Sequence, residues 1–501
     1  MKKLFWLFPV LFLIDNVMGA NGYQFTFFGI GIRILLFALS MASLGLYCLL
    51  TIRQQKITLW KRQSAQPYFW DLVKPIDYFV LGFILWNLFW AVVVPRIKPG
   101  NPACGLDDFD PMLVLALHFP CAFLLRTKHL HMRSVIKWLL PLVALLAVWH
   151  SVMYLGETAS DGFYMGYYDL IDKISFGTAV RTEVITGVGI TRIIQVTSVL
   201  LIPGMLLLLE HCAGKRRVWP YVLLAPMLFA VLVTYTKSIW FGVLAGLIVA
   251  VIGFVICEKD LGAKKRSLVF LLVMTVMLCL FNNCILHNTI VTRTLNIANP
   301  SSVEKLDSQI ADLQAQMDKL QAEATKPTDP SDPTDATAPV EAPDLDKLAQ
   351  KLEDLENQRQ DAAGTAVSKA LREEQDSALL EKWSKSKWIG FGYGAYVEDC
   401  IRNEQFPFMY ESLIPALLLK LGLVGLFGWG VFVAAMVYFA AKAMWKKPLQ
   451  FWSWLGIGLA YAMAVQTNPF LFTFPGFSIM LYLSLLISAE ECYEPDSAVN
   501  L

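Results

Sequence analysis

Charged side chains within or beside long apolar stretches are the first candidates for chemistry in this sequence. Arg33 lies inside an early apolar stretch, Arg192 and Lys237 stand at the beginning of two later ones, and Lys420 interrupts another. A charge held at membrane depth costs about 2.5 to 3.5 kcal/mol on insertion scales, so a retained charge is a functional candidate. The alternative is that each cation extends to its own interface or pairs with a nearby acid.

An anionic ligand is the chemistry that these cations suit. Arg181 and Arg402 lie in loops beside the same stretches, and with Arg192 and Lys237 they form a predicted diphosphate site. Guanidinium groups bind such oxyanions through two parallel hydrogen bonds. Glu411 is the acid best placed to act as a general base on a sugar hydroxyl, although a carboxylate at a helix start can equally be a cap. We therefore predict Arg192 and Glu411 as catalytic residues.

Aromatic side chains beside these stretches could stack on sugar rings. The candidates for a glycan surface are Tyr164, Tyr167 and Tyr168 in one loop, Tyr393 in a glycine-rich loop, and Tyr410 next to Glu411. The alternative for the first three is an interfacial aromatic belt. The glycines at 390, 392 and 394 permit positive φ and close backbone approach. No Gly-Lys-Ser/Thr follows them, so this loop is not a nucleotide-binding P-loop.

The elements that must position these residues are membrane helices. Of the 501 residues, 56% are hydrophobic and 17% charged, whereas a soluble globular protein has about 45 to 50% apolar and about 25% charged residues. A soluble enzyme is therefore excluded. The nine cysteines include no Cys-x-x-Cys pair, so no metal site is predicted. The surplus basic residues lie in short loops between apolar stretches, which gives no support to a nucleic-acid partner.

The hydropathy pattern predicts an all-α polytopic bundle of about twelve transmembrane helices. The predicted spans are 4–19, 25–51, 75–95, 111–126, 135–155, 192–212, 219–235, 238–257, 267–286, 409–442, 452–467 and 470–489. Alternate loops are rich in Lys and Arg, which places both termini in the cytoplasm. The predicted organisation is nine spans in 1–286, an extracytoplasmic loop over 287–408, three spans in 409–489 and a cytoplasmic tail over 490–501.

The long loop contains an aqueous insertion. Residues 301 to 387 hold 19 acidic and 11 basic side chains. Apolar residues recur at steps of four and three from Leu306 to Leu320 and again from Leu345 to Leu355, which predicts a coiled-coil hairpin over 301–360. A third helix is predicted over about 366–383. The hairpin is either a spacer or an arm that binds a partner, such as other envelope polysaccharide machinery.

The order of motifs along the chain resembles the O-antigen ligase and O-antigen polymerase family over roughly residues 181 to 486. The resemblance is carried by Arg192 before a stretch through Pro203, by Thr234-Tyr235-Thr236-Lys237-Ser238, by Trp388 to Gly394, by Tyr410-Glu411 leading into Lys420 to Gly425, and by Thr467-Asn468-Pro469. Lys237 stands where the family usually has an arginine. Glu411 stands where the ligase branch usually has a histidine.

This resemblance implies a GT-C-like glycosyltransferase of the bacterial cytoplasmic membrane with an outward-facing active site. Such an enzyme transfers a glycan from an undecaprenyl diphosphate carrier to a glycan or lipid acceptor, with membrane lipids as its surroundings and without a metal or other cofactor. No histidine occurs between Asn288 and Phe408, so a polymerase or a Gram-positive-type relative fits better than a ligase.

Two other classes of function use the same features. A transporter or flippase of lipid-linked sugars would also have a polytopic body with buried cations, but would predict related halves of the hydropathy pattern. We find no convincing repeat. A non-catalytic envelope assembly protein would use the hairpin to recruit partners.

Overall fold

The computed structural model describes residues 2–19, 23–27, 30–60, 67–98, 102–160, 162–174, 179–181, 192–214, 218–286, 302–324, 342–401 and 406–490. The chain divides into two units, each treated by itself. The first comprises Met1–Ile185, Arg192–Leu278 and Gln375–Leu501, and the second comprises Thr186–Thr191 and Cys279–Glu374. All the polar clusters and the cavity described below lie in the first unit.

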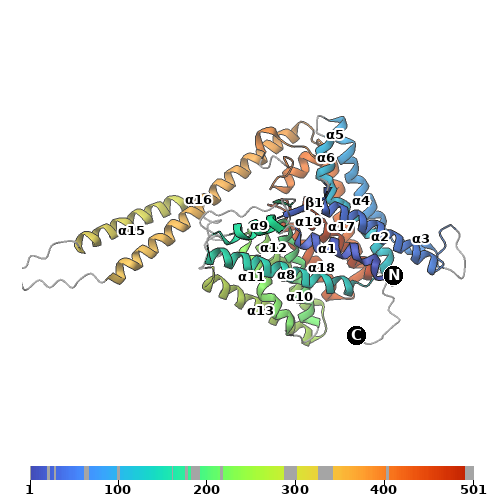
Figure 1. The fold of residues 1–501 in the computed structure, drawn as a ribbon, viewed down its shortest axis with the longest axis horizontal. Helices are drawn as coiled ribbons and strands as arrows, with labels where there is room; N and C mark the ends of the chain where they lie inside the picture. The colour runs from blue at the N-terminus through green and yellow to red at the C-terminus, as the bar shows by residue number, and fades with distance from the viewer. Residues whose placement is uncertain are drawn as a thin grey trace, which may run out of the picture. The chain divides into compact units, whose positions relative to one another are not determined.

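Helices account for most of the described residues (Figure 1). The α-helices are α1 (Leu7–Met18), α2 (Ile32–Gln54), α3 (Phe69–Leu72), α4 (Pro75–Val92), α5 (Val94–Ile97), α6 (Pro102–Phe109), α7 (His118–Arg126), α8 (Met132–Ala159), α9 (Phe163–Ile174), α10 (Leu201–Gly214), α11 (Trp219–Val233), α12 (Lys237–Cys257), α13 (Leu261–Cys284), α15 (Ser302–Ala324), α16 (Ala342–Ser384), α17 (Leu413–Met444), α18 (Pro448–Ala464) and α19 (Phe474–Glu490). The 3-10 helices are η1 (Lys2–Trp6), η2 (Asp110–Leu117), η3 (Val196–Leu200), η4 (Glu398–Cys400) and η5 (Pro469–Phe472).

Eight helical stretches in the described part of the chain are long and apolar enough to cross a membrane. They are Ile32–Gln54, Pro75–Ile97, Cys104–Arg126, Met132–Ala159, Val196–Gly214, Lys237–Cys257, Leu261–Cys284 and Leu413–Met444, and α11 and α19 are shorter apolar helices. Each needs about 20 residues to cross about 30 Å of hydrocarbon. The fold is therefore that of an α-helical polytopic membrane protein. The predicted number of twelve spans and the side on which the termini lie stay predictions.

Three short strands interrupt the helical pattern. The strand β1 (Tyr23–Phe27) pairs antiparallel with β2 (Ile30–Gly31) and with β3 (Ala179–Arg181). The predicted span over 25–51 is thus wrong at its beginning, because the chain becomes helical only at Ile32. Aromatic residues alternate with polar ones along Tyr23–Phe27. The partner strand β3, which completes the sheet, lies more than 150 positions away in sequence.

The helices α12 and α18 pack at backbone distance. A Cβ added at Gly246 would lie 2.5 Å from the Gly456 carbonyl oxygen, and one added at Gly242 would lie 2.6 Å from the Ala460 carbonyl oxygen. Small residues allow this close packing where lipid provides no hydrophobic drive between helices. The contact holds the beginning of α12 beside the end of α18, at the positions used by the candidate site.

The second unit contains helical pairing of the kind that the two apolar seams predicted. Arg359 on α16 forms an ion pair with Asp307 on α15, and Leu306 and Leu313 on α15 are buried. A separate third helix over 366–383 is wrong, because α16 runs unbroken from Ala342 to Ser384. The sequence between the predicted second and third helices contains only one glycine and no proline, so nothing in it ends a helix.

Candidate functional site

Arg192 is fixed against the turn that precedes α12. Residues 192–195 are extended, and the Ile193 backbone N–H donates to the Val233 carbonyl at 3.0 Å. The Arg192 guanidinium donates from Nε to the Thr234 carbonyl at 2.9 Å and from Nη2 to Thr236 Oγ1 at 3.0 Å. Helix begins only at Val196, so Arg192 does not open a helix as predicted. It lies instead in an extended segment that brings a half-buried cation to the α12 N-terminus.

The N-terminus of α12 is tied to the turn after α18. Lys237 is the first residue of α12, with Thr236 as its N-cap. The next residue, Ser238, donates its hydroxyl to the Ala464 carbonyl at 3.2 Å and accepts from Asn468 Nδ2 at 2.8 Å. Because the end of α18 also packs closely on α12, the position of Lys237 is set from two sides.

Glu411 precedes the N-terminus of α17 at the same turn. Ser412 is the N-cap of α17, and the Leu413 N–H donates to the Gln466 carbonyl at 3.2 Å. The turn at 466–468 therefore contacts the beginnings of both α12 and α17. Glu411 itself is half-buried. The same turn thus links the first turns of two helices, and unpaired N–H groups give each helix N-terminus a partial positive charge that favours anions.

The glycine-rich loop after α16 packs onto a break in α17. Gly390, Gly392 and Gly394 have φ values of 70°, 88° and 77°, as glycine permits, and Gly422 interrupts α17 with φ 63°. A Cβ added at Gly390 would lie 2.6 Å from the Gly422 nitrogen. The close approach that the glycines allow is thus to the protein's own backbone.

Main-chain hydrogen bonds are exchanged between this loop and α17. The Leu419 and Lys420 carbonyls accept from the N–H groups of residues 391 and 392, at 2.9 and 2.8 Å. The N–H groups of residues 423 and 424 donate to the carbonyls of residues 387 and 388, at 2.9 and 3.0 Å. In an unbroken helix these carbonyls and N–H groups would bond to each other. The loop therefore satisfies the groups that the break at Gly422 leaves unpaired.

Lys420 forms a buried ion pair, which agrees with the alternative that a cation in an apolar stretch pairs with an acid. Its Nζ lies 2.8 and 2.7 Å from the two carboxylate oxygens of Asp108 on α6, and the two residues are 1% and 2% exposed. The Gly394 N–H also donates to Asp108 Oδ2 at 2.9 Å, and the Phe472 ring centroid lies 4.1 Å from the lysine nitrogen. This partner neutralises Lys420, so the lysine belongs to the core.

Tyr393 and Tyr410 are buried, which differs from the glycan-facing position expected for them. Tyr393 is 0% exposed and donates its hydroxyl to Asn87 Oδ1 at 2.6 Å. Tyr410 is 4% exposed, and its oxygen accepts from the Val397 N–H at 2.7 Å. Burial raises the pKa of both phenols, so both stay protonated. Tyr393 anchors the glycine-rich loop to α4 through Asn87. Tyr410, the residue before Glu411, is anchored to the Val397 backbone.

The other predicted site residues are described only in part. Tyr167 lies on α9, half-buried, with its ring 5.9 Å from that of Trp149. Tyr164 and Tyr168 lie on the same helix, and Arg181 is in β3 opposite Tyr23, but their side chains lie outside the described residues. Arg402 also lies outside them. Among the predicted site residues, Arg192 bonds to Thr236 beside Lys237. Glu411 belongs to a second segment, which is linked to the start of α12 through the turn at 466–468.

Asp108 and two other polar clusters escaped the sequence analysis. Asp77 on α4 bonds to His118 at 2.9 Å and to Arg126, and His118 bonds to Ser484 on α19 at 2.9 Å. Arg33 donates from Nε to Asp15 Oδ2 at 2.9 Å, which explains a carboxylate inside an apolar stretch. A cation inside the membrane requires a partner. The presence of Asp15, Asp77 and Asp108 in or beside apolar stretches could therefore have identified them as partners for the cations.

The sequence was compared with known protein families, curated proteins and solved structures. No family model, no curated protein and no solved structure matches this sequence. Within the described residues, no group of three or more His, Cys, Asp or Glu side chains is arranged to hold a metal ion. The functional conclusion therefore depends on the chain's own chemistry.

Proposed function

We propose that this chain is a glycosyltransferase of the O-antigen polymerase and ligase type. It acts in the bacterial cytoplasmic membrane as a bundle of about twelve spans, with both termini in the cytoplasm and the site facing outward. Its donor is a glycan on an undecaprenyl diphosphate carrier, and its acceptor is a second glycan or a lipid. The product is a surface polysaccharide.

The proposal is supported most by one observation: the turn at 466–468 is bonded to the starts of both α12 and α17, and Arg192 is bonded to the N-cap of α12. The hydrogen bond from Asn468 to Ser238 ties this turn to α12 at 2.8 Å. The Leu413 N–H ties it to α17 at 3.2 Å. Two cationic side chains, two helix N-termini and one carboxylate then belong to one region. Such a region suits an anionic leaving group beside a hydroxyl to be deprotonated.

The chemistry needs only these groups. The acceptor hydroxyl oxygen attacks the anomeric carbon of the donor sugar, and its proton passes to the Glu411 carboxylate. The bond between that carbon and the diphosphate oxygen breaks, and the electron pair leaves with the diphosphate. Arg192 and Lys237 stabilise the charge that grows on the departing oxygen. Because a glycosyl diphosphate has a good leaving group, no catalytic acid is required.

The identity of the proposed general base, Glu411, favours a polymerase over a ligase. The ligase branch uses a histidine where this chain has Glu411, and no histidine occurs from Asn288 to the C-terminus. A carboxylate oxygen can take the proton of a sugar hydroxyl directly. Polymer length on the carrier lipid is therefore the relevant readout.

The test replaces the three residues singly, as Arg192→Ala, Lys237→Ala and Glu411→Gln, in cells that lack the native gene. We expect each variant to be present in the membrane at the wild-type level and to leave the lipid-linked glycan as single units on the outer leaflet. Gel analysis of the released glycans measures chain length, and labelling of the lipid-linked glycan with a membrane-impermeant reagent measures the leaflet. Lys446→Ala, an exposed lysine after α17, is the matched control and should give wild-type chains.

Each alternative function has its own outcome. Units retained on the inner leaflet in the three variants would favour a flippase and contradict the proposal. Wild-type chain length in all three variants, with polysaccharide lost only when the hairpin helices α15 and α16 are removed, would favour an assembly protein. Short chains in Lys446→Ala as well would mean that loss of positive charge in general, and not this site, is responsible.

A further inference from the structure

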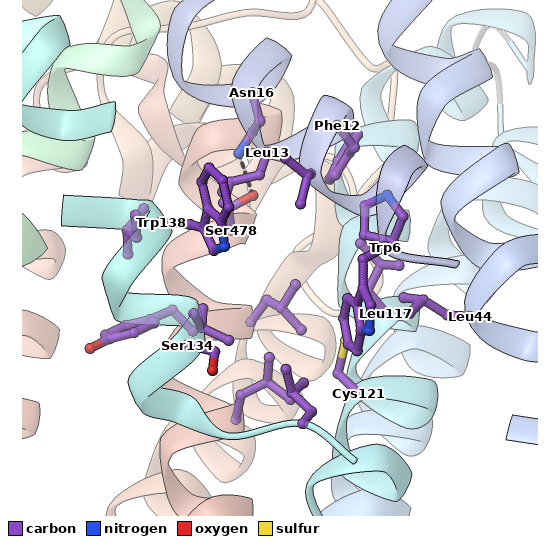
Figure 2. A pocket seen from close by; sticks show the side chains of 18 of the residues that line it. Trp6, Phe12, Leu13, Asn16, Leu44, Leu117, Cys121, Ser134, Trp138 and Ser478 are labelled. Atoms are coloured by element: carbon purple, nitrogen blue, oxygen red, sulfur yellow. Dashed lines mark hydrogen bonds between the residues drawn. The ribbon is translucent and has the colours of Figure 1, made fainter. Parts of the chain in front are cut away.

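An apolar cavity lies between α1, α8 and α19 (Figure 2), and its lining does not include Arg192, Lys237 or Glu411. Its volume is about 800 Å³. The side chains of Phe12, Leu13 and Trp6 approach it from α1 and η1, and those of Trp138 and Ser134 from α8 (Figure 2). Other parts of the wall come from α2, η2, α7 and the α10 region. Ligand cavities of about 300 to 1,000 Å³ with mostly apolar walls are typical small-molecule sites.

The lining of the cavity is somewhat longer than the hydrocarbon part of one membrane leaflet. Its lining extends along the chain from Leu4 to Val17, which corresponds to about 20 Å at the helical rise. The hydrocarbon core of a membrane is about 30 Å thick, so one leaflet contributes about half of that. At the deep end Asn16 Nδ2 donates to Ser478 Oγ at 2.8 Å. A single extended hydrocarbon chain fits a space of this length and lining.

Hydrocarbon is the content that such walls require. Side chains that border an empty space lose dispersion contacts, and an apolar wall offers water too few hydrogen-bonding partners. The α1 helix has 12 residues, of which only Phe12, Asn16 and Val17 are buried. A lipid chain lying between α1 and its neighbours would complete this packing.

The other end of the cavity is cationic. Lys3, His129 and His131 belong to its lining, and Lys128, Arg133 and Lys137 are exposed in the adjacent turn and first turns of α8. No Asp or Glu occurs between residues 111 and 156. The His129 ring is held in place, because Nδ1 donates to the Thr127 carbonyl at 2.9 Å and the ring edge meets Tyr47 at 5.7 Å. Basic clusters at the membrane surface attract anionic lipid headgroups.

We propose that this cavity binds one anionic phospholipid. One acyl chain occupies the space between α1, α8 and α19, and the phosphate lies on the basic rim formed by Lys3, His129 and His131. The lipid is not a substrate of the proposed transfer reaction, and its binding does not depend on that reaction. It holds α1 against α8 and α19.

The full chain purified in mild detergent allows a direct test. We expect native mass spectrometry to show one retained phosphatidylglycerol. Added dioleoyl phosphatidylglycerol should raise the melting temperature, and dioleoyl phosphatidylcholine with the same chains should raise it less. Replacing Lys3 with Glu should weaken phosphatidylglycerol binding at least about fivefold, since each basic residue near a membrane surface contributes roughly that factor. Lys442→Glu, at the far end of α17 in sequence and exposed, is the charge control.

A second variant separates the cavity from the rim. Leu13→Trp places a larger ring in the cavity and should abolish retention of the lipid while the protein still reaches the membrane. Leu11→Trp lies on the same helix, is 39% exposed and does not line the cavity, so it should retain the lipid. Equal stabilisation by the two lipids, equal retention in Leu13→Trp and Leu11→Trp, or recovery of a polyprenyl lipid in place of the phospholipid would each overturn the proposal.

Discussion

Lys420 and Arg192 are both cations beside membrane helices, but their surroundings differ. Lys420 is 1% exposed and lies against the Asp108 carboxylate. Arg192 is half-buried, and a carbonyl and a hydroxyl oxygen position its guanidinium. The carboxylate neutralises the lysine inside the protein, whereas a carbonyl and a hydroxyl fix the direction of a guanidinium that is only half-buried. A fully buried, neutralised charge serves packing, and a half-buried, oriented guanidinium is placed to contact an anion.

The largest expected effect is on the buried pair. Lys420→Ala leaves the Asp108 carboxylate buried without its cation, and breaking such a pair costs about 3 to 5 kcal/mol. We expect the free energy of unfolding, measured in detergent with a chemical denaturant, to fall by this amount. The double variant Lys420→Met with Asp108→Leu should recover much of the loss. A single variant as stable as the wild type would contradict the structural role assigned to the pair.

The second effect is on catalysis, at Arg192. Arg192→Ala should lower the rate of glycan transfer about 100-fold or more, as loss of one group that stabilises transition-state charge does. Its stability should fall less than that of Lys420→Ala, because two hydrogen bonds to neutral acceptors contribute only about 0.5 to 1.5 kcal/mol each. Transfer rate and unfolding are measured on the same preparation. If Arg192→Ala and Lys420→Ala lost transfer rate and stability to the same extent, the two cations would not have the different roles assigned to them.

The third effect is at the break in α17, close to Lys420. Gly422→Ala forces a side chain into a φ of 63°, which costs about 1 to 2 kcal/mol, and its Cβ would lie 2.5 Å from the Gly390 nitrogen. We expect a lower thermal midpoint. Gly430→Ala is the matched control on the same helix, because a Cβ there meets nothing within 4 Å. A loss of stability at Gly430 as large as at Gly422 would show that the break is not the cause.

The smallest effect is expected for the exposed pair on the hairpin. The side chains of Arg359 and Asp307 are 50% and 47% exposed. Water screens such pairs, which contribute about 0.2 to 1 kcal/mol. Arg359→Gln should therefore change the helix content of the hairpin, followed by circular dichroism on heating, by little at low salt and by nothing at high salt. A large change would show that this exposed pair contributes to stability as much as the buried pair of Lys420 and Asp108.

The helices were predictable because apolar stretches of sufficient length have few structures available in lipid. Each predicted span contains helix, from the first at α1 to the last at α19. The charged candidates were predictable in the same way, since a charge in an apolar stretch is visible in the sequence.

The partners of those charges were not predictable. Asp108 is 312 positions from Lys420, and no local pattern joins residues so far apart. The pairing of Tyr23 with Arg181 in the sheet could not be predicted for the same reason. The glycine-rich loop was recognised as a place of close backbone approach, but the sequence does not say to what. Whether glycines admit a ligand or another segment depends on the fold around them. Here Gly390 faces Gly422. Gly392 instead faces Pro95, and Gly394 faces the backbone at Cys104.

The exchange of hydrogen bonds at Gly422 makes α17 and the glycine-rich loop inseparable. Straightening α17 would require the loop to withdraw and four main-chain bonds to change partners together. The amides of Leu423 and Val424 therefore act as reporters for a segment that precedes them by more than 30 residues. Their deuterium uptake would record the departure of the loop, even though the loop itself need not unfold.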